Sequence, residues 1–193
     1  MIEGVSTAEE ASMPTPREYG APPQVTPKGL TDYLEAMSKC VMQTGISWTV
    51  VDKKWPELRE AFLRFDPQRL LALDEADIEA LLTDTRITRN RTKVNAVLHN
   101  ASRMLELEEQ HGTFRKYLRS KADYWDRVKM LGKDFKFMGD MGAFHFLYVV
   151  KEQVPSYDEW RAVVKPKRAP EPGTPRAQGG RGTATAAARR TRS

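Results

Sequence analysis

The chain has 193 residues, a net charge of +5 and a single cysteine, Cys40. This length suits one domain of about 130 residues once the termini are set aside, and one cysteine excludes an internal disulfide framework. No stretch approaches the roughly 18 apolar residues of a membrane span, and no charged start followed by an apolar run opens the chain. We therefore expect a cytoplasmic monomer without membrane association, located at the nucleoid if the source is bacterial.

The positive charge is concentrated at the C-terminus. Residues 165–193 hold eight of the 31 Lys and Arg residues and one of the 26 acids, so they carry +7 and the rest of the chain carries −2. This tail and the proline-rich start are rich in Pro, Gly and small residues and lack periodicity, which is typical of disorder. We predict a flexible leader over 1–27, a helical domain over 28–160 and a basic disordered tail over 161–193. The tail is either solubilising or a nonspecific phosphate-binding arm.

The apolar periodicity between the termini is helical. Thr31 is expected to cap a first helix that ends near Gly45, and Pro56 is expected to start a second helix. Asp66 and Asp74 are typical N-caps of two further short helices. No alternating strand pattern or internal repeat is present, so the sequence predicts an all-α fold, with core aromatics Phe62, Phe65, Phe114 and Trp125.

A long helix is expected to begin after residue 90 and to end at Gly112, and Thr113 is expected to cap another short helix. Residues 135–150 predict a turn that leads into a buried helix. Three scattered histidines, His99, His111 and His145, offer no ligand spacing for zinc and are interpreted as ordinary surface or core residues. No phosphate-binding glycine motif or nucleophile elbow is present, and no metal or cofactor is expected.

The segment TDTRITRNRTK, residues 83–93, lies between two predicted helices and is rich in basic residues. Backbone N–H groups at the start of the second helix, together with Thr88, Arg89, Arg91 and Lys93, suit a DNA phosphodiester. This arrangement is a helix-hairpin-helix. The alternative is a solvated surface turn.

Two regions together resemble the DNA-3-methyladenine glycosylase I family of helix-hairpin-helix base-excision enzymes. They are QTGISW at residues 43–48 followed by FDP and the basic hairpin, and GKDFKFMG at residues 132–139, which is similar to the family's GFKFVG block. The resemblance covers roughly residues 30–150. It implies a glycosylase-like helical domain that rotates an alkylated purine out of double-stranded DNA into a pocket.

The resemblance also implies roles for individual residues. Gln43 matches the residue that fills the vacated space in the duplex, and Ile46 matches the aliphatic wedge beside it. Trp48 matches the aromatic wall on which the flipped base stacks, and a cationic base such as 3-methyladenine is attracted to an indole face. The alternative is that Trp48 belongs to the core.

The chain departs from the family pattern at three places. Cys40 stands where the family has the pocket carboxylate, and Asp140 is the acid we would test first as its substitute. Glu35 is expected to point elsewhere, because five residues correspond to about 140° around a helix. The family's zinc ligands and N-terminal tyrosine motif are missing. Arg86 and Thr92 replace two hairpin glycines, which disfavours a positive-φ turn.

Three functions follow from these observations. The leading one is a monofunctional N-glycosylase for alkylated purines, without a Schiff base or strand nicking because no lysine matches a nucleophile position. The loss of the carboxylate favours a binding module that recognises damaged DNA without cutting it. A protein whose basic tail binds a partner other than DNA is the third.

Overall fold

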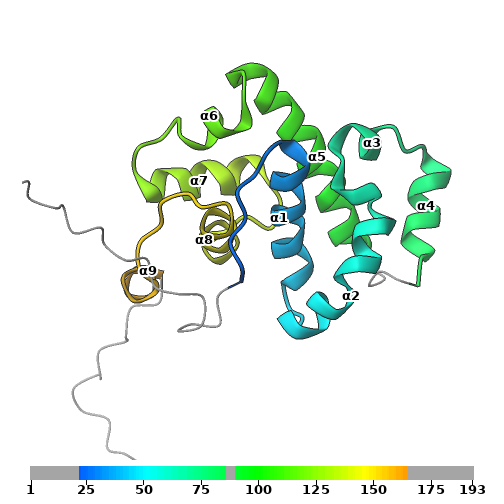
Figure 1. Cartoon of the computed structure of the whole chain (residues 1–193), viewed down its shortest axis with the longest axis horizontal. Coiled ribbons are helices and arrows are strands. Elements are labelled where there is room, and N and C mark those ends of the chain that lie inside the picture. The colour runs from blue at the N-terminus through cyan, green and yellow to red at the C-terminus, as the bar shows by residue number, and fades with distance from the viewer. Residues whose placement is uncertain (1–21, 86–89, 165–193) are drawn as a thin grey trace, which may run out of the picture.

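The computed structural model describes residues 22–85 and 90–164, and every regular element within these two ranges is a helix (Figure 1). The predicted all-α fold is confirmed. Among the described helices, none combines the length and the apolar character that crossing a membrane requires. In chain order the elements are α1 (Leu30–Gln43), α2 (Trp48–Ala61), the 3₁₀ turn η1 (Leu63–Phe65), α3 (Pro67–Leu71), α4 (Glu75–Thr83), α5 (Arg91–His111), α6 (Phe114–Leu118), α7 (Tyr124–Asp134), α8 (Asp140–Val149) and α9 (Tyr157–Val164).

Helix α1 is the centre of the molecule. It contacts α2, α3, α5 and α8, and in Figure 1 it lies between the α2–α4 side and the α6–α8 side. Leu34, Met37 and Val41 are fully buried at i, i+3 and i+7, so one face of α1 is sealed in the core. The opposite edge of the same helix is free to line a cavity.

Several predicted helix ends are confirmed. The Asp66 side chain accepts hydrogen bonds from Gln68 N and Arg69 N, and Pro67 is the first residue of α3. Asp74 and Asp77 form a capping box at the start of α4. Gly112 follows α5 with φ 78°, and the Thr113 side chain caps α6.

Two predicted helix starts were wrong. The N-cap of α1 is Gly29 instead of Thr31, and the Asp32 carboxylate accepts from Lys28 N at 2.7 Å in the first turn. Helix α2 begins at Trp48, and Pro56 lies inside it. Pro56 removes one helical hydrogen bond, but packing of Val51 and Leu58 in the core continues the helix on both sides of it.

The aromatic core differs from the prediction at one residue. Phe62, Phe65 and Phe114 are buried, whereas Trp125 at the start of α7 is only half-buried. Trp160 of α9 is 1% exposed and is the largest fully buried side chain of the described residues. Helices α7 and α9, which are short and rich in charged residues, were not predicted from the sequence.

The turn before α8 is built closely around Gly142. A Cβ atom at this position would lie 2.2 Å from the carbonyl oxygen of Phe137, whose own φ is 63°. Only glycine fits, because the 135–139 turn folds back over the first turn of α8. The predicted turn and buried helix are confirmed, and the turn sets the position of α8 beside α1.

Both predicted domain boundaries differ from the packed region. Gln24 Nε2 donates to Tyr148 O and Val25 N donates to Val149 O, so part of the expected leader packs on the end of α8. At the other end α9 continues to Val164, beyond residue 160.

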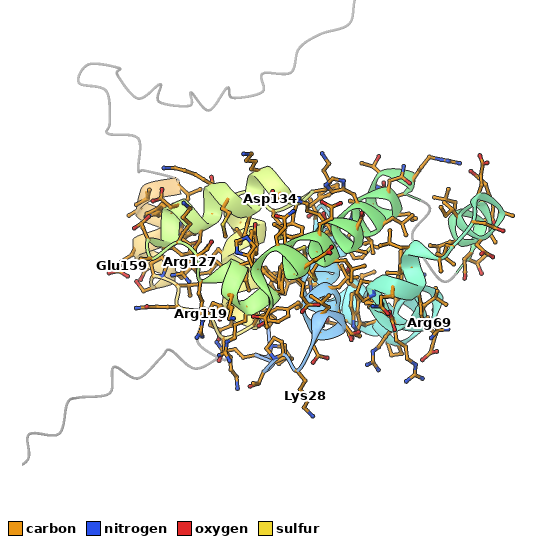
Figure 2. All side chains as sticks on the ribbon, turned by 90° about the horizontal axis from the view of Figure 1, so that it is seen from above. Lys28, Arg69, Arg119, Arg127, Asp134 and Glu159 are labelled. Carbon is orange, nitrogen blue, oxygen red and sulfur yellow. The ribbon has the colours of Figure 1, made fainter. Side chains whose placement is uncertain are left out.

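Ion pairs to one buried carboxylate link the helices α6 and α7 to the segment after α8. Glu152 is 4% exposed and its carboxylate accepts from Arg119 Nε at 3.0 and 3.1 Å, while Arg127 Nη1 lies 3.9 Å away. Figure 2 shows Arg119 and Arg127 at one end of the molecule and Arg69 of α3 toward the other. A buried carboxylate with several guanidinium partners is a structural group.

Candidate base-binding cavity

The stretch between α1 and α2 is a tight reversal. Thr44 N donates to Val41 O and Ile46 N donates to Gln43 O, while Gly45 adopts φ 73°, a left-handed conformation that favours glycine. Ser47 O then accepts from Val50 N and Val51 N and starts α2. As a result, the last turn of α1 and the first residue of α2 face the same space.

A cavity of about 290 Å³ occupies that space. It lies between α1, α2 and α8, and the segment before α1 closes one side. Trp48 and Cys40, the two residues predicted for the base pocket, both line it. The described lining residues are Pro22, Pro23, Val25, Asp32, Glu35, Ala36, Lys39, Cys40, Gln43, Trp48, Trp55, His145 and Val149.

Trp48 is half-buried and lines the cavity instead of being sealed in the core. Its ring meets the His145 ring edge-on, with 4.7 Å between the centroids and 88° between the planes. Trp55 forms a second aromatic wall and stacks on Phe65 at 5.2 Å. Two indoles on one cavity provide flat apolar surface of the kind that suits an aromatic ligand.

Cys40 contributes no charge to the cavity. Burial raises the pKa of its thiol to about 12, more than its own backbone and the positive charge of Lys39 lower it. The thiol is therefore protonated at neutral pH, and it cannot replace a carboxylate electrostatically.

Glu35 does line the cavity, and the expectation that it points elsewhere was wrong. Its carboxylate accepts from Trp55 Nε1 at 3.0 Å and from Arg59 Nε at 3.1 Å. The cavity is wide enough to take in two adjacent rows of α1, one with Glu35, Lys39 and Gln43 and the other with Ala36 and Cys40. A helical angle alone does not exclude a residue from such a site.

Asp140, the predicted substitute acid, is the first residue of α8 and is exposed. It is absent from the described residues that line the cavity, whereas His145 of the same helix is present. Five residues separate the two, so they lie about 140° apart around the helix axis. The structure does not bring Asp140 together with Trp48 and Cys40.

Gln43 and Ile46 differ in their exposure. Gln43 is 8% exposed and lines the cavity, and its Nε2 has no hydrogen-bond partner among the described residues. Ile46 lies at the tip of the reversal, partly buried against the core. In this conformation Gln43 is folded inward and would have to swing out to fill a gap in a duplex, and the wedge role of Ile46 stays a prediction.

The predicted phosphate-binding hairpin is only partly described. Thr88 and Arg89, together with Arg86, lie outside the described residues. Arg91 is exposed at the start of α5, and its Nη2 pairs with both carboxylate oxygens of Glu79 in α4, at 2.8 and 3.1 Å. A solvent-exposed ion pair of this kind is worth about 0–1 kcal/mol, so it does not prevent a phosphate contact.

The phosphate-binding prediction for Lys93 was wrong. Lys93 is 5% exposed, and its ammonium donates to the carbonyl oxygens of Met42 at 2.8 Å and Thr44 at 2.7 Å. Burial lowers the pKa of this group. Lys93 therefore caps the C-terminus of α1, where a positive charge is favoured, and links α5 to the reversal. Thr92 is helical and has no positive φ, so the expected strain is absent there.

No group of His, Cys, Asp and Glu side chains within the described ranges is arranged to hold a metal ion. Three further residues with polar groups line the cavity and were not predicted to belong to it, namely Glu35, Trp55 and His145. His145 had no signal in spacing or charge, because it enters the site only through the packing of α8 on α1. Trp55 and Glu35 lie 20 residues apart and form a hydrogen bond that the sequence does not reveal.

Comparison with known proteins shows the family of the chain. A family model described as methyladenine glycosylase matches residues 24–136, more than half of the chain, and the chain belongs to this family. It is 35% identical over 86 residues to DNA-3-methyladenine glycosylase 1 of Escherichia coli, covering 45% of this chain and 46% of the relative. It is 35% identical over 76 residues to DNA-3-methyladenine glycosylase of Haemophilus influenzae, covering 39% and 41%. The matches thus span less than half of these curated relatives.

The fold is similar to solved structures over a longer stretch. A crystal structure of 3-methyladenine DNA glycosylase I superimposes with a TM-score of 0.56 and 28% identity, covering 65% of this chain and 81% of that one. The Staphylococcus aureus enzyme, solved for 3-methyladenine recognition, gives a TM-score of 0.56 and 25% identity, covering 65% and 78%.

Proposed function

We propose that this protein is a monofunctional DNA N-glycosylase that removes alkylated purines such as 3-methyladenine from double-stranded DNA. The observation that carries the proposal is the position of Trp48, half-buried on the wall of a cavity directly behind the reversal at Gly45. A volume of about 290 Å³ lies at the low end for ligand sites. It suits one flipped base better than a whole nucleotide.

Base selection begins with the aromatic walls. Bases stack on aromatic side chains with about 1–3 kcal/mol each. An alkylated purine nucleotide such as N3-methylated adenine carries a positive charge, which an indole face attracts more than it attracts neutral adenine. Trp48 thus favours the damaged base over the normal one.

The chemical step is hydrolysis of the N-glycosidic bond. The base leaves with the bonding electron pair, the sugar becomes oxocarbenium-like, and water supplies the oxygen of the product. An alkylated purine cation is a good leaving group, so positioning and a nearby negative charge account for much of the acceleration. We assign that charge to Glu35, because it lines the cavity while Asp140 does not.

A lysine on the cavity wall does not change the reaction class. The Lys39 ammonium pairs with Asp52 at 2.7 Å and lies over the Trp55 ring at 5.4 Å. A Schiff base requires a neutral amine aimed at the sugar carbon, whereas this ammonium is engaged with an acid and an indole. We therefore expect no covalent intermediate and no strand nicking.

DNA binding is assigned to the start of α5 and the segment before it. Arg91 and the N-terminal backbone of α5 suit phosphate contacts, and we retain Thr88 and Arg89 as proposed partners of the same strand. Ile46 would wedge into the duplex at the tip of the reversal. The protein is proposed to act as a monomer in the cytoplasm.

The test is release of free bases from methylated DNA, measured by chromatography. We expect 3-methyladenine release by the wild type, and a loss of about 100-fold in the Trp48→Ala variant, equivalent to about 2.7 kcal/mol. Trp125→Ala, which removes a half-buried indole of α7, is the matched control and should retain activity. Glu35→Gln should be impaired more than Asp140→Asn.

The absence of a charge at Cys40 supports a second candidate, a damage-recognising module that does not cut. Selective binding of methylated duplexes without base release at any protein concentration would establish that module and overturn the glycosylase. Trapping of a covalent adduct by borohydride would overturn the monofunctional mechanism alone.

A further inference from the structure

The charged residues that line the cavity already have partners within the protein. Both Glu35 carboxylate oxygens accept hydrogen bonds, one from Trp55 Nε1 and one from Arg59 Nε. Asp32 accepts from Lys28 N at 2.7 Å, and Lys39 pairs with Asp52 at 2.7 Å. These groups contribute an electrostatic field to the cavity. Recognition of a base edge requires hydrogen-bond donors and acceptors that have no partner within the protein.

Two neutral polar side chains on the same cavity are available. Gln43 is 8% exposed, and its Nε2 is buried without a partner in the described part of the chain. His145 projects from α8 to the Trp48 ring, and none of the hydrogen bonds among the described residues involves either of its ring nitrogens. A buried amide donor without a partner is destabilising, and an acceptor on a ligand would satisfy it.

We propose that Gln43 and His145 hydrogen-bond the edge of an adenine-type base that stacks on Trp48. The inference rests on the proposed function and names the recognition groups of that site. An adenine edge presents an N6 amino donor beside an N7 acceptor. Gln43 Nε2 donates to the ring nitrogen, and the neutral His145 ring accepts from the amino group. A guanine-type base presents an O6 acceptor in place of that donor, and is disfavoured.

Protonation of His145 would oppose this recognition in two ways. It removes the acceptor, and it places a positive charge beside a cationic base. Burial lowers the pKa of His145 below its ordinary value of 6.5, so the ring is neutral at physiological pH. Release of 3-methyladenine should therefore rise with pH through a step below 6.5 and be flat above it. Within residues 22–85 and 90–164, the other titratable groups that line the cavity lie on α1 and are Asp32, Glu35, Lys39 and Cys40.

The experiment measures release of 3-methyladenine and of methylated guanines from the same methylated DNA, as a function of pH. The variants are His145→Asn, which keeps a neutral polar group that does not titrate, and Gln43→Ala. Their matched controls are His99→Asn and Gln110→Ala, exposed residues of α5. Thermal unfolding followed by circular dichroism confirms that each variant is folded.

We expect kcat/KM for 3-methyladenine to fall about tenfold in both Gln43→Ala and His145→Asn. In both variants the preference for 3-methyladenine over methylated guanines should become smaller. The step in the pH profile below pH 6.5 should disappear only in His145→Asn. The inference is overturned if the wild type releases 3-methyladenine and both folded variants keep its rate, selectivity and pH profile. If the wild type releases no base, the proposed function itself fails, and this inference fails with it.

Discussion

The cavity and the start of α5 both adjoin the C-terminal end of α1, and in both the charge differs from what the residue types indicate. The Cys40 thiol brings no charge to the cavity, yet Glu35, Gln43 and His145 make the cavity polar. The start of α5 is rich in basic residues, yet Lys93 is turned inward and Arg91 is paired with Glu79. The residue type determines which charge a side chain can carry. Packing determines whether that charge can reach a ligand.

The largest expected effect concerns the neutral thiol in the cavity. Because burial raises the pKa of Cys40 to about 12, a thiolate is scarce at neutral pH. At pH 8 we expect alkylation by iodoacetamide to be at least about a hundredfold slower in the folded protein than in the urea-unfolded chain. Equal rates, measured by mass spectrometry, would contradict a buried Cys40 thiol with a raised pKa.

The next effect concerns Lys93. The Lys93→Met variant keeps the aliphatic volume but leaves the Met42 and Thr44 carbonyl oxygens without their donor. Hydrogen bonds to a charged group contribute about 1.5–3 kcal/mol, and relief of the buried charge offsets part of this loss. We expect the free energy of unfolding, measured in urea, to fall by about 2 kcal/mol, whereas exposed Lys133→Met of α7 should change it little.

The pH dependence of stability also distinguishes the wild type from the Lys93→Met variant. The pKa of Lys93 is lowered in the folded protein from its ordinary 10.5, so between these two values the unfolded chain binds more protons. The cost of burying the ammonium is full below the folded pKa and is relieved as pH rises toward 10.5. The stability that Lys93 contributes should therefore increase as the pH rises. The difference in the free energy of unfolding between the wild type and Lys93→Met should become larger. A gap that narrows would contradict a buried, desolvated ammonium.

The smallest effect concerns Arg91. Arg91→Ala should weaken binding to a duplex about threefold and reduce the slope of log affinity against log salt by about one. Glu79→Gln releases the Arg91 guanidinium from its ion pair and should tighten binding slightly. Fluorescence anisotropy at several salt concentrations measures both, with exposed Arg161→Ala of α9 as the control. If Arg161→Ala matches Arg91→Ala, the start of α5 is not the DNA-binding surface.

The sequence predicted the all-α fold and most helix ends, because capping residues such as Asp66, Asp74 and Thr113 act within one turn. The family resemblance placed Trp48 and Cys40 in one pocket, and both line the cavity. The sequence did not place His145, which reaches the site from α8 across the packed faces of two helices. It assigned Lys93 to DNA because an ammonium on a basic hairpin is normally solvated, whereas here the C-terminal carbonyls of α1 bind it.

The expectation that Glu35 points away from the pocket failed for a different reason. The helical wheel gives the angle between two side chains correctly, but it does not give the width of the cavity that they face. The Trp55 and Arg59 donors on α2 hold the Glu35 carboxylate at the cavity wall. Such a contact depends on the α1–α2 crossing and is therefore known only from the structure.

The most direct test of the central claim is a titration of the ¹⁵N-labelled protein with free 3-methyladenine, followed by the indole N–H signals in NMR spectra. If a base binds in the cavity, the signals of Trp48 and Trp55 shift with saturation, while that of Trp125 on α7 stays in place. Unchanged Trp48 and Trp55 signals up to the solubility limit of the base, or equal shifts at Trp125, would contradict a base-binding cavity behind the α1–α2 reversal.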